Sequence, residues 1–234
     1  MPLGFLGMSL SDLLIIIPAV LICLTIHEFF HGYIAYKLGD STAQITGRLS
    51  LNPIKHIDPI GFLCLVFFRF GWAKPVPVNT RYFKNPKRDL ALTALAGPLS
   101  NFVLSFLLLL ISALLYNFTW LYYLIPRVIS ALIVFLMTTA VLSAGLGVFN
   151  LIPVPPLDGS KIIIPMLPAK ILPFFLKYEF YFQFVILILL FTGVLTGVLV
   201  GARSIVLKGL YAVVSLLLGI FGLDTGFMSV FIGV

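Results

Sequence analysis

The sequence predicts an all-α polytopic membrane protein with about five to six transmembrane helices, re-entrant segments and a small β element at the cytoplasmic face. The chain of 234 residues is 61% hydrophobic and 10% charged, whereas an ordinary soluble domain is roughly 25% charged. Its mean hydropathy is +1.15, and several apolar runs are long enough to cross a bilayer. No repeat, low-complexity tract or linker divides the chain, so we expect a single integral-membrane domain over residues 1–234.

Five apolar stretches are long enough to span a bilayer at ~1.5 Å of helix per residue. They are residues 13–37, 90–116, 127–150, 178–202 and 204–222. No removable signal peptide is expected before the first, because residues 1–14 lack a basic region and a small-residue cleavage site.

Two further apolar pieces are too short or too broken to be simple spans. Residues 59–72 are short, and residues 151–168 contain five prolines. We expect re-entrant or interfacial segments there, although whether 59–72 spans stays open at this point.

Three glycines in the fourth predicted span, Gly193, Gly197 and Gly201, recur every four residues. Such a face of small residues favours close helix packing within the chain or, alternatively, a homodimer.

The positive charges predict the orientation of the chain in a cell membrane. Residues 37–88 hold nine of the fifteen Lys and Arg residues. Because cytoplasmic loops are rich in Lys and Arg, the large basic segment 38–89 is expected in the cytoplasm and, counting five spans, so is the C-terminus. The net charge of +7 therefore indicates a lipid bilayer rather than a nucleic acid as partner. Within this segment, residues 47–52 and 74–79 look like short extended pieces and predict the β element.

The first predicted span contains His27, Glu28 and His31 in the pattern H-E-x-x-H. Residues four apart lie on one face of a helix, so both imidazoles can bind one metal ion while Glu28 flanks them. Three ionisable groups in lipid are costly unless they meet a partner, a cavity or a metal. The pattern therefore indicates a metal site.

A catalytic zinc site needs a third protein ligand, and Asp158 is the best candidate. It lies in the proline-broken apolar stretch 150–159, and irregular backbone at membrane depth is tolerated where it lines a cavity or is buried in protein. An N-cap for a short helix is the alternative role of Asp158. Cys23, one turn before His27, is a less favoured ligand, and His56 is expected to have a surface or gating role.

The chain resembles the site-2 protease family of intramembrane metalloproteases over roughly residues 20–165. The resemblance rests on the H-E-x-x-H pattern followed by N-x-x-P-x-x-x-L-D-G at 150–159, and on further motifs at 52–59, 71–79 and 96–101. The resemblance is to a compact form of the family, so we expect neither the PDZ nor the CBS modules of larger members.

The resemblance implies a single metalloprotease domain with one Zn²⁺ per chain, held by His27, His31 and Asp158, and with Glu28 as the catalytic acid and base. The implied substrate is a transmembrane segment of another protein. Asn101 could bind the oxyanion or the substrate backbone, or could equally be polar glue between helices.

A metal-binding membrane transporter or sensor without hydrolytic activity is the rival function, because His and Asp also line ion pathways. Glu28 discriminates between the two, since catalysis needs a carboxylate beside the metal and binding does not. A structural zinc site is weaker, because such sites are four-coordinate and rich in cysteine.

Overall fold

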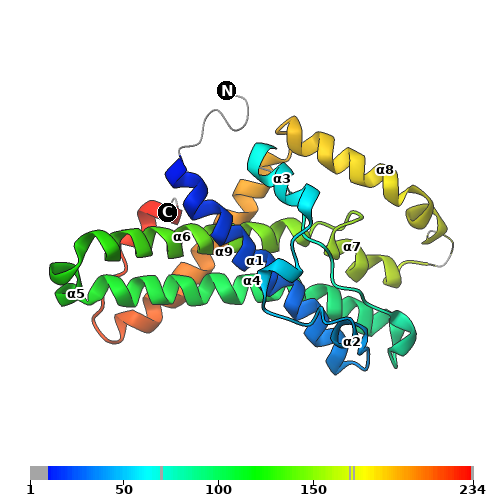
Figure 1. The fold of residues 1–234 in the computed structure, drawn as a ribbon, viewed down its shortest axis with the longest axis horizontal. Coiled ribbons are helices and arrows are strands. Elements are labelled where there is room, and N and C mark those ends of the chain that lie inside the picture. Colours follow the sequence, from blue (N-terminus) through cyan, green and yellow to red (C-terminus); the bar gives the residue numbers. More distant parts are fainter. Residues whose placement is uncertain (1–9, 69–70, 169, 171, 233–234) are drawn as a thin grey trace.

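The computed structural model describes residues 10–68, 71–168, 170 and 172–232 as an assembly of helices (Figure 1). The longer helices are α1 (Leu10–Lys37), α3 (Pro59–Phe68), α4 (Pro86–Asn117), α6 (Pro126–Asn150), α8 (Leu172–Phe191) and α9 (Thr196–Gly219). The short helices are α2 (Thr42–Ile45), α5 (Thr119–Leu124), α7 (Asp158–Ile163) and α10 (Phe227–Ile232). Single 3₁₀ turns form at Pro53–Lys55, Thr80–Tyr82 and Ile164–Met166.

Four of the described helices are long and apolar enough to cross a membrane: α1 from Asp12, α4, α6 and α9. The predicted all-α membrane architecture is confirmed at this level. Prolines set two of the boundaries, because Pro86 and Pro126 stand in the first turns of α4 and α6, where the missing N–H has no helical partner to lose.

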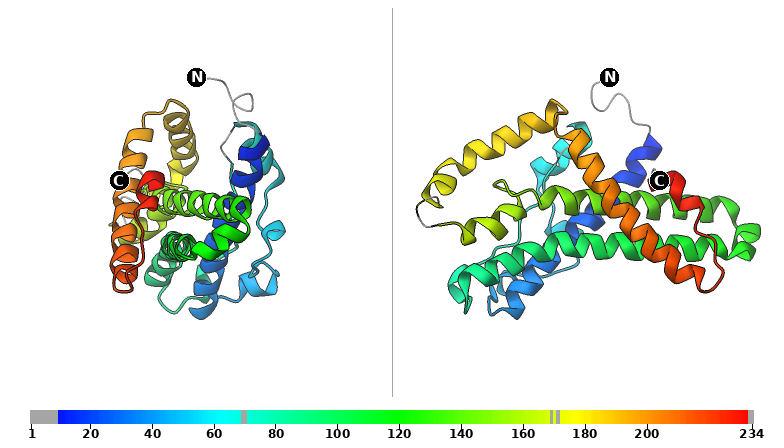
Figure 2. Two further views of the ribbon diagram at one scale, coloured as in Figure 1. Left: turned by 90° about the vertical axis from the view of Figure 1, so that its left-hand side faces the viewer. Right: turned by 180° about the vertical axis from the view of Figure 1, so that it is seen from behind.

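The antiparallel pair α4 and α6 forms the centre of the molecule, with α1 on one side of the pair and α9 on the other (Figures 1 and 2). Small side chains such as Ala113 and Ala140, both fully buried, let the helices approach closely. The Ser105 hydroxyl donates to the Ala140 carbonyl at 2.9 Å, and the Ser143 hydroxyl donates to the Asn101 carbonyl at 2.8 Å. These bonds fix the register of α4 against α6.

The fourth and fifth predicted spans are divided at a different place from the one expected. The sequence predicted a break near residue 203, but α9 runs through it, and the chain turns between α8 and α9 at Gly193, whose φ is +76°. Glycine adopts this conformation at little cost. Gly193 is therefore separated from Gly197 and Gly201, and the three do not form one helical face.

The C-terminal end of α9 lies beside the C-terminal end of α4. Asn117 Nδ2 donates to the Asp224 carbonyl at 2.7 Å, the Asp224 amide donates to Asn117 Oδ1 at 2.9 Å, and the rings of Tyr116 and Phe227 stack at 4.1 Å. Residue 224 is thus at the opposite end of the α4–α6 pair from segment 38–89. The five-span count, which put the C-terminus on the side of that segment, does not fit this packing.

The predicted small sheet is not present in the described residues, where one antiparallel bridge joins Ile57 and Ala73. The segment 74–79 is extended, but its prolines at 75 and 77 have no N–H to donate. Two of the remaining backbone amides donate to side chains: the Val76 amide donates to Glu28 and the Asn79 amide donates to Asp40. A ladder of backbone hydrogen bonds therefore has too few donors to form here.

Candidate active site

The two histidines of the H-E-x-x-H pattern are buried on one face of α1. His27 is 4% exposed and His31 is 8% exposed. Their rings meet edge to face, with centroids 4.5 Å apart. The spacing of four residues therefore brings the rings together, as predicted.

Asp158 joins the two histidines from a distant part of the chain. It is the first residue of α7, and its Oδ2 lies 3.0 Å from His27 Nε2 and 3.0 Å from His31 Nε2. The two Nε2 atoms are also 3.0 Å apart. Leu157 occupies the N-cap position of α7, so the structure does not give Asp158 the alternative role of a helix cap.

These three atoms fit a zinc ion in spacing and chemistry. In tetrahedral zinc sites with Zn–N and Zn–O bonds of ~2.0–2.1 Å, neighbouring ligand atoms are about 3.3 Å apart. His31 Nδ1 lies 2.7 Å from the Thr93 carbonyl oxygen, which can only accept, so Nδ1 carries the hydrogen. The Nε2 lone pair then points at the Asp158 carboxylate, an arrangement that is repulsive unless a cation lies between them.

His27 is held on its other ring nitrogen by Asn101, whose Nδ2 lies 3.1 Å from His27 Nδ1 as placed, while its Oδ1 is buried without a partner. The two amide orientations of an asparagine are nearly indistinguishable. With Oδ1 turned to Nδ1, the amide accepts the Nδ1 hydrogen and leaves Nε2 free for a metal. Asn101 is fully buried and touches a candidate ligand, which supports a positioning role over the predicted contact with the oxyanion.

Two glycines allow the helices to approach the site. A Cβ at Gly97 of α4 would overlap the rings of both His31 and His27. A Cβ at Gly159 would overlap the carbonyl groups of Leu151 and Ile152. The motifs around Gly97 and Asp158 therefore include glycine because a side chain would push α4 or α7 away from the histidines.

Glu28 lies half-buried beside this cluster and contacts the extended segment 74–79. Its Oε2 accepts a hydrogen bond of 2.8 Å from the Val76 amide. Arg48 also holds this segment, since its guanidinium donates to the carbonyls of Lys74 and Pro75 at 2.6 and 3.1 Å. Val76 is the one residue of 75–77 with a backbone N–H, and that hydrogen points at Glu28.

Two other candidates lie apart from the histidines. The Cys23 thiol contacts the Thr139 carbonyl at 3.6 Å. His56 is 2% exposed rather than at the surface, and its Nε2 contacts the Ser50 carbonyl at 2.7 Å. In the described part of the chain the potential metal cluster consists of His27, His31 and Asp158.

Sequence reasoning missed two partners of the cluster. Lys161 Nζ lies 3.1 Å from Asp158 Oδ1 and so neutralises the carboxylate oxygen that faces away from the histidines. Its spacing of three residues from Asp158 on a helix could have indicated this pair. The Thr93 carbonyl carries no signal in the sequence, because any residue supplies one.

Comparisons with known proteins show the family of the chain. The model of peptidase family M50 matches residues 15–193, more than half of the chain. The chain is 37% identical over 208 residues to YwhC of Bacillus subtilis strain 168, named as a candidate zinc metalloprotease, with 87% of this chain and 94% of YwhC covered.

The chain is also similar to Rip2 of Mycobacterium tuberculosis strain H37Rv, which is named in the same way. The two are 32% identical over 172 residues, which cover 71% of this chain and 61% of Rip2. Rip2 of Mycolicibacterium smegmatis is 30% identical over 172 residues, which again cover 71% of this chain and 61% of Rip2. No solved structure matches the chain.

Proposed function

The chain belongs to peptidase family M50, the site-2 protease family, and is a zinc metalloprotease; we propose that His27, His31 and Asp158 hold its zinc ion. The observation that carries this proposal is the meeting of three ligand atoms at 3.0 Å from two distant segments. These residues would hold a zinc ion, which would supply a water of lowered pKa, near ~7, and polarise the scissile carbonyl.

Glu28 is the proposed catalytic acid and base. Its carboxylate takes the proton of the attacking water and returns it to the leaving amine. The Val76 amide, 2.8 Å from Oε2, holds one carboxylate oxygen and leaves the other for this transfer. Segment 74–79 thus orients the base as well as bordering the site.

Three neighbours position the ligands. Thr93 and Asn101 keep the imidazoles turned so that Nε2 points inward, and Lys161 balances the charge of Asp158. Partners of this kind typically contribute a factor of about 10–100 in metal affinity or activity.

The proposed substrate is a transmembrane segment of another protein. The site lies in α1, one of the candidate spans, so the bond to be cleaved must reach membrane depth. We expect α3 and residues 71–73 to form a re-entrant hairpin, since the ten residues of α3 cover about 15 Å, half of a bilayer core.

The proposed location is the cell membrane, with the basic segment 38–89 in the cytoplasm. Water then reaches the site from that side, because His31 lies six residues before Lys37, or ~9 Å along α1. A homodimer stays a prediction. Its seam would use Gly197 and Gly201 of α9, where an added Cβ would meet nothing within 4 Å.

Metal removal tests the function. A chelator should abolish cleavage of a single-span model substrate by the detergent-purified chain, and one equivalent of Zn²⁺ should restore it. Cleavage that continues in the chelated protein would contradict metal-assisted hydrolysis and point to a contaminating protease.

A further inference from the structure

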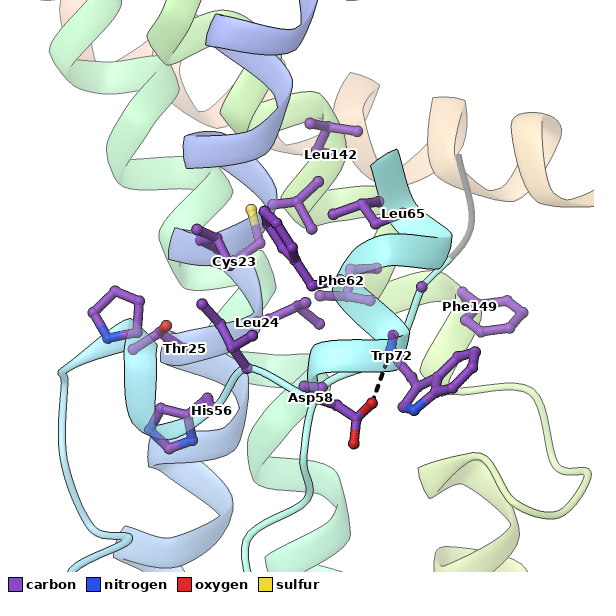
Figure 3. A pocket seen from close by; sticks show the side chains of 18 of the residues that line it. Cys23, Leu24, Thr25, His56, Asp58, Phe62, Leu65, Trp72, Leu142 and Phe149 are labelled. Carbon is purple, nitrogen blue, oxygen red and sulfur yellow. Dashed lines mark hydrogen bonds between the residues drawn. The ribbon is translucent and has the colours of Figure 1, made fainter. Parts of the chain in front are cut away.

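A cavity of about 310 Å³ is enclosed by parts of α1, α3 and α6 (Figure 3). Its wall includes Cys23 and Leu24, one helical turn before His27, and continues over α3 and α6. Aliphatic and aromatic side chains, among them Phe62, Leu142 and Phe149, form most of this wall (Figure 3). A molecule in the cavity would therefore contact α1 one helical turn before His27.

Arg203 of α9 is the cation of this wall. Its stem crosses α6 at Gly145, where a Cβ would lie 3.4 Å from Arg203 Cδ. Its Nε is buried and has no hydrogen-bond partner, and the ion pairs found among the described residues do not include Arg203. A cation at membrane depth is costly unless it meets a partner. The guanidinium of Arg203 is therefore suited to bind an anionic group that enters the cavity.

Asp58 and His56 also border the cavity, and neither is bonded to Arg203. Asp58 Oδ1 accepts a hydrogen bond of 2.8 Å from the Gly61 amide. His56 Nδ1 is buried without a partner, but a ring nitrogen of a neutral imidazole carries no charge that could balance a guanidinium. Asp58 therefore brings one negative charge to the same wall, but among the described residues no ion pair joins it to Arg203, whose Nε stays without a partner.

The depth of the cavity indicates which anion can reach it. The wall extends from residues 20–25 of α1, at the middle of the candidate span Asp12–Lys37, to Pro53 and Asp58 of the basic segment 38–89, so its inner end lies at mid-membrane depth. Lipid phosphates lie outside the hydrocarbon core, whereas a peptide segment that crosses the membrane reaches its middle. A peptide side chain is therefore the better source of the negative charge.

We propose that this cavity is a substrate subsite in which Arg203 pairs with one acidic side chain of the membrane-spanning substrate segment. The inference rests on the proposed function and adds a specificity determinant to it. An acidic residue is itself costly in lipid, so the pair gains from burying both charges together. Substrates with an Asp or Glu at the matching distance from the cleaved bond are preferred.

Binding tests this proposal separately from cleavage. The zinc-loaded Glu28→Gln chain in neutral detergent is titrated with fluorescent single-span peptides of about 20 residues. Each peptide carries one Asp at a successive position and has a twin with Asn there. At one or two adjacent positions the Asp peptide should bind about tenfold more tightly than its twin or better.

Substitutions of Arg203 assign the preference. Arg203→Gln should remove it, Arg203→Lys should keep part of it, and Arg203→Glu should reverse it in favour of a Lys peptide at the same position. Lys208→Gln is the matched control, because Lys208 is an exposed cation of the same helix outside the cavity. Zinc content and gel filtration show that each variant is folded.

A preference for Asp that is equal at all positions, or that persists in Arg203→Gln, would overturn the subsite. So would a preference that disappears when phosphatidylglycerol is added to the micelles, because the arginine would then bind lipid. Cleavage of the peptides by the unsubstituted chain is measured in parallel. A positional preference without cleavage supports the subsite and contradicts the protease, whereas cleavage without the preference does the reverse.

Discussion

His31 is the ligand candidate whose chemistry is most fully determined by its neighbours. The Thr93 carbonyl, 2.7 Å from Nδ1, sets the tautomer, and Gly97 leaves room for the ring. The H-E-x-x-H pattern predicted the two rings on one face, because helical spacing alone decides that. The partners that orient the rings depend on how α4 packs against α1, which the pattern does not contain.

Gly97→Ala should weaken zinc binding by about tenfold or more, since the new Cβ overlaps both imidazole rings. Alanine is the better helix former by ~0.8–1.0 kcal/mol, so lost affinity cannot come from the helix itself. Competition with a chelating dye measures the affinity. Gly197→Ala is the control, because its Cβ meets nothing within 4 Å. Equal zinc affinity in the two variants would show that the close approach of α4 to the histidines does not affect zinc binding.

Asp158→Ala should lose both zinc and cleavage, because it removes one of three ligand atoms and leaves Lys161 without its partner. Asp158→Ser should fail in the same way, whereas a capping role would leave it almost silent, since Ser caps about as well as Asp. Cys23→Ser should keep full zinc. Zinc stoichiometry by mass spectrometry decides, and a fully occupied Asp158→Ala protein would remove this ligand from the site.

At the scale of elements, the extended segment 74–79 shows why the predicted sheet did not form. The prolines in it suggested an edge strand, but they also remove the donors that pairing requires. The segment is held instead by Glu28, Arg48 and Asp40. The conformation of segment 74–79 is therefore set by single side chains that lie far apart in the sequence. No local pattern indicates these contacts.

Asp40→Asn tests whether this anchoring matters. Asp40 is fully buried and accepts from the Asn79 amide at 2.6 Å and from the amide and hydroxyl of Thr42. The amide should lower the free energy of unfolding by about 1–3 kcal/mol and reduce cleavage while zinc content stays complete. Asp224→Asn, at the far end of α4, is the control and should leave cleavage unchanged. Equal cleavage by both variants would show that the segment does not orient Glu28.

The division between α8 and α9 was predicted at residue 203 because a charge inside an apolar run suggests a loop. The structure turns at Gly193 and keeps Arg203 within α9, half-buried over Gly145. Hydropathy cannot distinguish an arginine in a loop from one that faces a cavity. Tertiary packing makes that difference.

At the scale of the whole molecule, the all-α membrane architecture followed from composition and from the length of the apolar runs. The packing adds an orientation that hydropathy did not give, because residue 224 is bonded to the end of α4 opposite segment 38–89. Counting spans amplifies a single error, since one span more or fewer reverses the predicted side of everything that follows.

Labelling of introduced cysteines tests this orientation. In a chain whose own cysteines are replaced by serine, Lys84→Cys should react with an impermeant reagent from the cytoplasmic side, as the positive charges around it require. Asp224→Cys should react from the opposite side. Labelling of both positions from one side would contradict the orientation of α4 and α9 and would require a different path for water.

The central claim is that Glu28 performs chemistry beside a metal that other residues hold. Glu28→Gln tests it most directly, because the amide cannot take a proton while His27, His31 and Asp158 remain in place. Zinc content and cleavage of a single-span substrate are measured on the same purified sample. We predict one zinc per chain and cleavage reduced by about a hundredfold or more. Near-normal cleavage by the zinc-loaded variant would contradict the assignment of Glu28 as the base.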